Sequence, residues 1–553
     1  MITFILNGKK QSWDGDPDLT LLKYLRLEKH ITSVKDGCSA QSACGACTVE
    51  INGQAKLSCI TKISKLQDAE INTLEGFPEY VKETIAKAFV NKGAVQCGFC
   101  TPGFIARTKV LLQDNPAPTI EEIRKAIKPH LCRCTGYKKI EQAIQLAGSA
   151  LGKHEHLEIY KTSGKVGTSY PKYQACQTAI GERDFVDDLF FDGMLFAALK
   201  FSDHPSAKVL KINIKKAQDL PGVIHVFTAK DIPGEHKVGL IFQDWPVMID
   251  EGETTHYIGD VIAGVVAETD KIARQAVGLI KVEYEIHQPL TDVFKAISGK
   301  RIHPERPNHF STTQFTVGNV KEARPVSIYH ANGHYETQRI EHGFMEKESA
   351  VAMPDGKGGL KLYSQSQGIY EDRRQVAMIL GIPENKVRVI LVPNGGGFGG
   401  KEDLSIQGQV SLFAWLLKKP VKLTLSRQES FRLHPKRHPI FMDIELGADE
   451  KGKLTFLKLS AVGDTGAYAS VGTKVLERVA GHAAGGYYIP NVEIEAKTVY
   501  TNNIPGGAMR GFGAPQVAFA LESCIDDLCR KGNFDRWQFR YENALVDGLS
   551  TAT

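Results

Sequence analysis

Two segments near the start of the chain alternate between hydrophobic and polar residues in the way that short strands do. Residues 2–14 and 47–60 each hold two apolar runs separated by Asn-Gly, a dipeptide that tolerates the positive φ angles of a tight hairpin turn. Between the two segments, leucines recur from Leu21 to Leu27 at near-helical spacing. The pattern predicts a hairpin, a helix and a second hairpin, with the helix lying across a small sheet.

From about residue 80 the hydrophobic period becomes helical. Residues 81–90 predict a first helix, and Thr101-Pro102 opens a second, because threonine can cap a helix and proline suits its first turn. Thr119 and Glu122 have the spacing of a capping box and predict a third helix. A fourth is expected to begin near Tyr137. Four such helices predict a bundle.

A polar stretch separates this bundle from the larger part of the chain. Residues 153–175 carry glycine and serine and few apolar residues, which is typical of a linker. From residue 178 to about residue 289, strand-like runs such as 223–228 and 261–268 alternate with helical stretches such as 270–277. The alternation predicts a mixed α/β domain.

Composition and charge describe a chain of several domains. Its 553 residues are 42% hydrophobic, and no apolar run is long enough to cross a bilayer. The net charge of +5 comes from 68 basic and 63 acidic residues that are scattered, which argues against nucleic acid and anionic membranes as partners. The N-terminus does not have the pattern of a signal peptide, so we expect a reducing, cytoplasmic compartment.

Eight of the eleven cysteines form two groups of four with different spacing. The first thiol group is Cys38, Cys44, Cys47 and Cys59, and the second thiol group is Cys97, Cys100, Cys132 and Cys134. Iron-sulfur clusters are held by four cysteine sulfurs, so two clusters are predicted. Three thiols of the first group lie on a Gly- and Ser-rich loop, and Cys59 is expected on the far strand. A bundle would bring both halves of the second group to one end.

Other uses of these cysteines fit less well. A disulfide framework needs a secreted protein. Structural zinc prefers two Cys-x2-Cys pairs, whereas this chain has a Cys-x5-Cys-x2-Cys run and a Cys-x-Cys pair. The remaining cysteines are expected to be buried thiols in apolar cores, and they are Cys176, Cys524 and Cys529.

The densest motif of the second half is glycine-rich. Residues 394–402 read Asn-Gly-Gly-Gly-Phe-Gly-Gly-Lys-Glu. A phosphate-binding loop would need Ser or Thr where Glu402 stands, because that hydroxyl binds magnesium. A flexible turn would explain the permissive backbone but not the Phe, Lys and Glu.

Three cysteine motifs carry a resemblance to a known family. GCSAQSACGACTV, QCGFCTPGF and CRCTGY resemble the paired [2Fe-2S] domains of the molybdenum hydroxylases, the xanthine dehydrogenase and aldehyde oxidoreductase family. That family usually has four residues between its first two cysteines, and residues 39–43 make five here. The longer loop and the missing flavin domain are similar to the selenium-associated purine hydroxylases of anaerobic bacteria.

The resemblance implies a multidomain α+β architecture. Its parts are a plant-ferredoxin-like β-grasp [2Fe-2S] domain at 1–76, a four-helix [2Fe-2S] bundle at 77–152, the linker at 153–175, an α/β hammerhead domain at 176–310, and the first half of a molybdopterin-binding domain at 311–553.

The same resemblance implies a pocket for a molybdenum-molybdopterin cofactor. The GGGFGGKE loop would pass beneath the metal, with the backbone beside Phe398 and Gly399 approaching its ligands. Gln367 resembles a glutamine that hydrogen-bonds a molybdenum oxo group, and Arg510 resembles an arginine beside the metal. The implied pterin contacts from the domain of the second cluster are Gln96 and Cys134.

Two charged positions and one ring bear on the substrate. Glu402 and Arg478 align with residues that purine-oxidising members use to bind the heterocycle, and Phe512 with a ring that stacks on the substrate. Aldehyde-oxidising members generally have apolar residues at the two charged positions. Catalytic roles are implied for Glu402, Arg478 and Arg510. The alternative is that Glu402 and Arg478 pair with each other or with water.

The implied activity is hydroxylation of a purine such as xanthine, or of a related N-heterocycle, with electrons leaving through two [2Fe-2S] clusters. The family's general base is a glutamate in a Gly-x-Gly-Glu motif of a longer chain, and no counterpart stands in this sequence. We therefore expect a second chain with the rest of the molybdenum domain. No FAD is expected in this chain, so a separate FAD subunit or a ferredoxin would accept electrons. The alternatives are an aldehyde oxidoreductase and a non-catalytic electron-transfer subunit.

Overall fold

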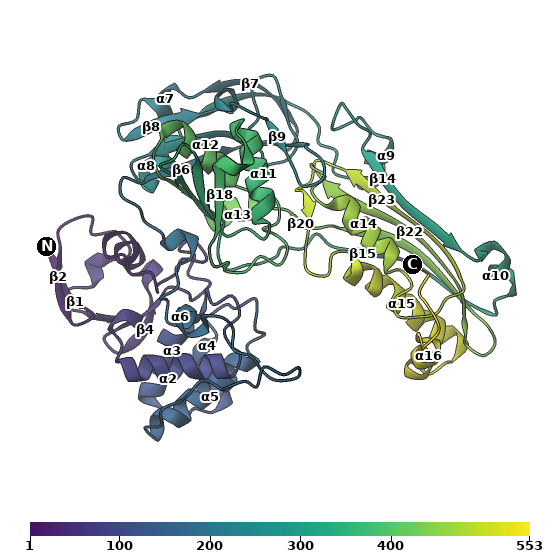
Figure 1. Cartoon of the computed structure of the whole chain (residues 1–553), viewed down its shortest axis with the longest axis horizontal. Helices are drawn as coiled ribbons and strands as arrows, with labels where there is room; N and C mark the ends of the chain where they lie inside the picture. Colours follow the sequence, from purple (N-terminus) through teal and green to yellow (C-terminus); the bar gives the residue numbers. More distant parts are fainter. Residues whose placement is uncertain (553) are drawn as a thin grey trace.

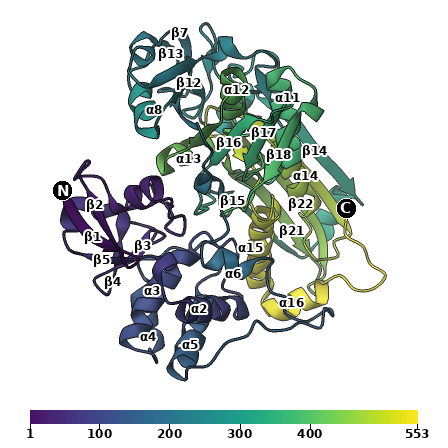
Figure 2. The same ribbon diagram turned by 60° about the vertical axis from the view of Figure 1, so that its left-hand side comes forward.

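The computed structural model describes residues 1–552. A small sheet and a helical bundle form the N-terminal part, drawn in purple and blue, and two larger sheets with their helices form the rest (Figure 1). The turned view keeps the N-terminal part to one side of both large sheets (Figure 2).

The N-terminal sheet has five strands in the order β2-β1-β5-β3-β4. Asn7 and Asn52 each have a φ of 49°, so the two predicted Asn-Gly hairpins are confirmed. The helix between them begins as α1 (Leu21–Lys23) and continues as a π turn, Tyr24–Glu28. The strands are β1 (Ile2–Leu6), β2 (Lys9–Trp13), β3 (Thr48–Ile51), β4 (Gln54–Leu57) and β5 (Glu70–Asn72).

Four helices follow, as the sequence predicts, and pack as a bundle. The predicted capping box is present, since Thr119 and Glu122 cap each other's backbone. Thr101 was expected to cap the second helix, but it is that helix's first residue and Cys100 is at the cap position without a side-chain hydrogen bond. The helices are α2 (Glu79–Asn91), α3 (Thr101–Asp114), α4 (Ile120–Ile127) and α5 (Lys138–Gly152).

The second sheet has seven strands in the order β18-β17-β16-β19-β6-β12-β8. Its strands are β6 (Leu195–Phe201), β8 (Val223–Phe227), β12 (Val261–Ala267), β16 (Ser349–Pro354), β17 (Leu360–Ser364), β18 (Val387–Leu391) and β19 (Val421–Thr424). Parallel pairing of β6 with β19 joins the two halves of this sheet across the domain boundary expected at residue 310.

Helices and a smaller sheet surround the seven strands. They are α7 (Lys215–Gln218), α8 (Asp270–Val277), α11 (Ile369–Leu380), α12 (Gln407–Leu417) and α13 (Arg427–Leu433), with strands β7 (Ala207–Asn213), β11 (Thr254–Thr255) and β13 (Lys281–Ile286). The helix α6 (Ala175–Ala179) packs instead on α2 and α3 of the bundle. The helix α12 packs on β16, and α8 packs on β6.

The third sheet has the order β14-β23-β22-β21-β15, and α14 and α15 pack against it. Its strands are β14 (His309–Val317), β15 (Tyr329–Thr337), β21 (Ile440–Ala448), β22 (Leu454–Gly466) and β23 (Asn491–Tyr500), and the helices are α14 (Gly472–Gly481), α15 (Ala514–Gly532) and α16 (Arg536–Asn543). The remaining elements are α9 (Val293–Ser298), α10 (Val320–Val326), β9 (Lys237–Val238), β10 (Trp245–Pro246), β20 (Lys436–Arg437) and β24 (Gly506–Gly507).

Among residues 1–552, no helix combines the length and the apolar character that a membrane crossing requires.

A buried charge cluster ties the N-terminal sheet to the segment before β6. Asp188 forms ion pairs with Arg26, at 2.9 Å, and with Lys35, and its side chain is 1% exposed. Arg26 also reaches Asp187, 2.9 Å away. Charges buried in this way stay paired because removing one partner leaves the other uncompensated.

We expect Asp188→Asn to lower the free energy of unfolding by about 3–5 kcal/mol, since buried Lys35 would lose its carboxylate partner and Arg26 would keep only Asp187. Asp18→Asn is the matched control, because its pair with Lys62 is mostly exposed and contributes about 1 kcal/mol or less. Thermal unfolding of both variants measures the difference. Equal melting temperatures would contradict the assignment.

Candidate functional site

The first thiol group is buried between β3, β4 and the loop before β3. Cys38, Cys44 and Cys47 lie on that loop, and Cys59 lies in a one-turn 3-10 helix after β4, not on the far strand as expected. The Cys44 side chain hydrogen-bonds Cys38 and lowers the pKa of Cys38 to about 5. Cys47 likewise lowers the pKa of Cys59. The four sulfurs therefore form two pairs.

The second thiol group lies at one end of the bundle, and its side-chain contacts run in the order Cys97, Cys134, Cys132, Cys100. A hydrogen bond from Cys134 lowers the pKa of Cys97, and hydrogen bonds from Cys100 and then Cys134 lower that of Cys132 to about 2. The hydroxyl of Thr135 also donates to the Cys132 sulfur at 3.2 Å.

The spacing of the four sulfurs in each group distinguishes a two-iron cluster from a single zinc ion. Four sulfurs around a tetrahedral zinc, with bonds of about 2.3 Å, would all lie roughly 3.8 Å from one another. In residues 1–552, only Glu341, His342 and His434 place three metal-ligating atoms within 4.8 Å of one another. The thiols therefore fit a [2Fe-2S] cluster, in which two thiolates bind each iron.

The two thiol groups are adjacent. The carbonyl of Cys44 accepts a hydrogen bond from the backbone of Leu131, at 2.9 Å, one residue before Cys132. Phe99, from the second group's loop, packs with Cys38 and Cys44 in one small apolar cluster. Both clusters would thus lie close together through backbone and ring contacts.

Residues 395–401, the glycine loop, approach other backbone and side chains very closely. Phe398 has a φ of 56° and Gly399 one of 99°. A Cβ on Gly397 would lie 2.2 Å from Gln367 Oε1, and one on Gly400 would lie 2.7 Å from His342 Nδ1. At these two positions it is the close contact, not a positive φ, that requires glycine. No helix follows directly, since α12 begins at Gln407.

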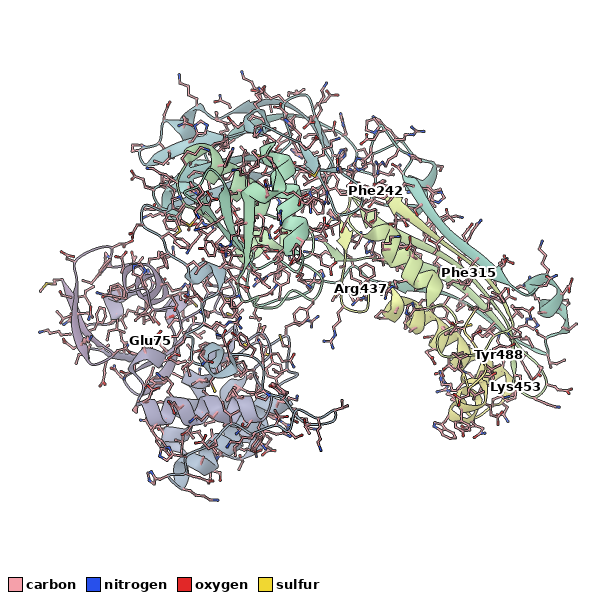
Figure 3. All side chains as sticks on the ribbon, viewed as in Figure 1. Glu75, Phe242, Phe315, Arg437, Lys453 and Tyr488 are labelled. Carbon is pink, nitrogen blue, oxygen red and sulfur yellow. The ribbon has the colours of Figure 1, made fainter. Side chains whose placement is uncertain are left out.

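Gln367 and Arg510 are held beside this loop. Gln367 Oε1 accepts hydrogen bonds from the backbone of Gly399, at 2.9 Å, and of Lys401, at 3.4 Å. The backbone of Arg510 donates to the Phe398 carbonyl at 2.9 Å. Arg437, labelled in Figure 3, donates to the Arg510 carbonyl at 2.8 Å. The structure therefore brings together Gln367, Phe398, Gly399 and Arg510.

Charged groups are buried behind the loop. The Lys401 ammonium is 3.4 Å from a carboxylate oxygen of Glu346, and both side chains are 2% exposed. That oxygen also accepts from the backbone of Gly395 at 2.6 Å. Burial raises the pKa of Glu346 to about 7, against the opposing effect of Lys401. Sequence reasoning missed Glu346, because a lone glutamate in an irregular segment carries no periodic signal.

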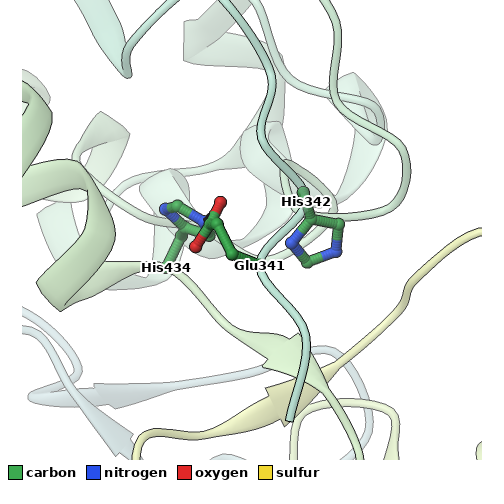
Figure 4. Close-up of side chains that lie close together, drawn as sticks. All are labelled: Glu341, His342 and His434. Atoms are coloured by element: carbon green, nitrogen blue, oxygen red, sulfur yellow. Dashed lines mark hydrogen bonds and ion pairs between the residues drawn. The ribbon is translucent and has the colours of Figure 1, made fainter. Parts of the chain in front are cut away.

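Glu341, His342 and His434 form the group that could hold a metal by distance alone (Figure 4). His434 Nε2 is 2.9 Å from one oxygen of Glu341, and the Lys436 ammonium is 2.8 Å from the other. His342 Nε2 donates to the Ala508 carbonyl at 2.7 Å. Because Lys436 already supplies a cation to the carboxylate, we assign the group to a buried charge network and not to a metal site.

The loop of the second thiol group touches the same region. Arg133, between Cys132 and Cys134, donates to the His342 carbonyl at 3.0 Å. His342 in turn contacts Gly400 of the glycine loop. Cys134 is half-buried, whereas Gln96 is exposed and its carbonyl accepts from Lys172 of the linker. Contacts thus run from the second thiol group to the glycine loop.

The predicted substrate residues are only partly brought together. Arg478 is exposed on α14, and its guanidinium lies 6.0 Å from the centre of the Phe512 ring. Glu402 is half-buried, and burial raises its pKa. Within residues 1–552 no ion pair joins Glu402 to Arg478 or to another cation, so the part of the alternative in which these two charges pair with each other is wrong. Asp403 links this end of the loop to Ser470, just before α14, by a 2.7 Å hydrogen bond.

Sequence comparisons agree with this arrangement. Residues 14–87 match a 2Fe-2S iron-sulfur cluster binding domain and 73–145 a [2Fe-2S] binding domain. Residues 180–288 match the a/b hammerhead domain of aldehyde oxidase and xanthine dehydrogenase, and 302–544 match a molybdopterin cofactor-binding domain. The predicted fold class, two [2Fe-2S] clusters and molybdopterin cofactor are thereby confirmed.

Two relatives are similar over the larger part of the chain. A "Probable xanthine dehydrogenase" subunit of Bacillus subtilis is 40% identical over 365 residues, 66% of this chain and 49% of that protein. "Nicotinate dehydrogenase large molybdopterin subunit" of Eubacterium barkeri is 35% identical over 390 residues, 70% of this chain and 91% of that protein.

A solved structure is similar along the whole chain. Aldehyde oxidoreductase from Desulfovibrio gigas has a TM-score of 0.95 at 30% sequence identity, covering 100% of this chain and 63% of that one. The chain thus spans about half the length of the Bacillus relative and under two thirds of the Desulfovibrio protein.

We expect Cys38→Ser to abolish the first cluster and spare the second, so that iron falls from about four to about two atoms per chain. Iron analysis and electron paramagnetic resonance of the reduced protein measure both. Cys176→Ser is the control, because Cys176 lies outside both thiol groups. An unchanged two-cluster spectrum in Cys38→Ser would exclude that residue as a ligand.

Proposed function

The chain belongs to the molybdenum hydroxylase family of xanthine dehydrogenases and aldehyde oxidoreductases, and we propose that it takes part in the hydroxylation of a purine such as xanthine or a related N-heterocycle. The carrying observation is Glu402, a half-buried carboxyl group without an ion-pair partner in residues 1–552. A carboxyl group in that state gains a hydrogen bond when a ring N–H reaches it. An aldehyde has no such donor.

The glycine loop and its neighbours fit a molybdenum-molybdopterin cofactor. Gln367 is exposed, and its Oε1 is fixed by loop amides, which leaves its NH2 group as a free donor within residues 1–552. The half-buried backbone at Phe398, next to Gly399, is the proposed point where the loop approaches the cofactor, and Arg510 adds an exposed cation. When bound, the cofactor supplies the oxygen transfer and the two-electron oxidation. Gln96 and Cys134 are the proposed contacts from the second cluster's domain.

Substrate would be held by Glu402, Arg478 and Phe512. The Phe512 ring offers a face for stacking a flat heterocycle. Arg478, which lies over that ring, would stabilise negative charge on a ring carbonyl as it develops during the reaction. The distance of 6.0 Å between the guanidinium and the centre of the Phe512 ring would place this cation close to a heterocycle stacked on the ring.

Electrons would leave along the contacts already described. Arg133 joins the second thiol group to His342 beside the glycine loop, and the hydrogen bond from Leu131 to Cys44 joins the two thiol groups. We propose a separate FAD subunit or a ferredoxin as the next acceptor, and the cytoplasm as the compartment.

The general base and the remaining pterin contacts are proposed to come from a second chain with the rest of the molybdenum domain. The relative from Eubacterium barkeri is named as the large molybdopterin subunit of its enzyme, which supports a division of this kind.

Aldehyde oxidation is the second candidate function. It is supported by the likeness of the whole chain to an aldehyde oxidoreductase structure. Turnover of benzaldehyde without turnover of xanthine or hypoxanthine would favour it.

We expect Glu402→Gln, in the complex with its partner chain, to lower kcat/KM for xanthine about tenfold to a hundredfold, because a hydrogen bond to a charged group contributes about 1.5–3 kcal/mol. Steady-state kinetics with xanthine and benzaldehyde measure the effect. Glu477→Gln, which removes an exposed carboxylate next to Arg478, is the control and should leave kcat/KM unchanged. Equal loss with both substrates would count against a purine site.

The chain purified alone is expected to hold both iron-sulfur clusters but to lack molybdenum and activity, and coexpression with the partner should restore both. Metal analysis and a xanthine assay of the two preparations test this. Full molybdenum occupancy and turnover from the lone chain would refute the need for a partner.

A further inference from the structure

Arg427, the first residue of α13, reaches into the loop that carries the first thiol group. Its Nε and Nη2 donate to the carbonyl of Gly37, at 3.0 and 2.7 Å, and Nη2 also donates to the carbonyl of Met345 at 2.7 Å. Gly37 directly precedes Cys38, and a Cβ on it would lie 3.3 Å from the Cys44 sulfur. The guanidinium is therefore separated from the first thiol group by a single peptide unit.

The same loop has a strained backbone, and contacts that include a second cation hold it in place. Ser39, Ala40 and Ser42 all have positive φ angles, of 54°, 61° and 56°, in the stretch that is one residue longer than the family pattern. Residues other than glycine keep such angles only where surrounding contacts hold them. Ser39 Oγ accepts from the Arg427 backbone at 2.8 Å and from the Lys347 ammonium at 3.2 Å.

Arg427 is a buried cation without a carboxylate partner. It is 6% exposed, and in residues 1–552 no carboxylate oxygen lies within 4.0 Å of its guanidinium. Lys347, by contrast, pairs with Asp36 at 2.8 Å. The guanidinium also lies over the rings of Phe344 and Phe431, and the carboxylates whose charges act on it from farther away are Glu348, Glu341 and Asp36. The thiolates of a bound cluster add negative charge on the far side of Gly37, and Cys44 is already among the groups whose charge acts on Arg427.

We propose that Arg427 is a positioning residue for the first [2Fe-2S] cluster and that its charge raises the reduction potential of that cluster. Reduction adds one electron to the cluster and no proton, so the reduced form carries one more negative charge. A fixed cation nearby stabilises the reduced form more than the oxidised form. The larger, molybdopterin-binding part of the chain would thereby set how readily the N-terminal domain accepts an electron.

The test is a redox titration of the holoprotein, with the two clusters followed separately by electron paramagnetic resonance. The ratio of reduced to oxidised first cluster is compared at the midpoint potential that this cluster has in the unaltered protein. We expect Arg427→Gln to lower that ratio about threefold or more, and a tenfold change corresponds to about 59 mV for one electron. The second cluster should not shift. Arg427→Lys, which keeps the charge, should recover most of the ratio.

Arg432→Gln is the matched control, because Arg432 lies on the same helix and donates to carbonyls of Ser202 and Ile258, away from the thiols. It should leave both clusters unchanged. Asp36→Asn is a second test that applies if Arg427→Gln does not fold. This substitution leaves the Lys347 charge unpaired and should raise the reduction potential of the first cluster, the opposite of the change expected for Arg427→Gln.

An unchanged first cluster in Arg427→Gln with full iron content would overturn the proposal, as would equal shifts of both clusters. For a variant that cannot be purified, no shift in Asp36→Asn would do the same. Loss of the cluster in the unaltered protein would instead contradict the iron-sulfur assignment itself.

Discussion

The structure depends on one irregular segment, residues 341–348, whose polar side chains and carbonyls are paired although the segment belongs to no sheet. His342 contacts both the loop of the second thiol group and the glycine loop. Met345 packs with Cys38 and Cys44, Lys347 pairs with Asp36 just before them, and Glu346 anchors the start of the glycine loop. Buried backbone and charged groups must be paired. Because the buried polar groups of this segment find their partners there, the loops of the two thiol groups and the glycine loop are fixed relative to one another.

Local patterns predicted the fold well where the structure depends on neighbouring residues. The Asn-Gly hairpins, the capping box at Thr119 and the four helices follow from spacing of a few positions. Cys59 was expected on a strand, but the apolar run that suggested the strand ends in a 3-10 turn. Nothing in the sequence marks the pairing of β6 with β19, because parallel pairing between distant segments leaves no local signal.

The candidate site divides in the same way. Both thiol groups and the glycine loop are dense in unusual residues and could be found from the sequence. The need for glycine at positions 397 and 400 could not be predicted from the sequence, because it arises from close contacts with Gln367 and His342, which lie far away along the chain. Arg427 was missed because an arginine at the start of a short helix looks like a surface residue until its partners are known. A charged residue near a cofactor therefore cannot be recognised from the sequence when its partners come from distant parts of the chain.

The interlocking of the two large sheets limits how such a chain can be divided. Strands β14 and β15 of one sheet fall in the sequence between β12 and β16 of the other, so segments from residue 195 to residue 500 are interwoven. Residues 153–174 cross no sheet. A gene split there would yield two polypeptides with intact sheets, and an inserted domain there would disturb none. Modular rearrangement in evolution is therefore structurally easiest at this connection.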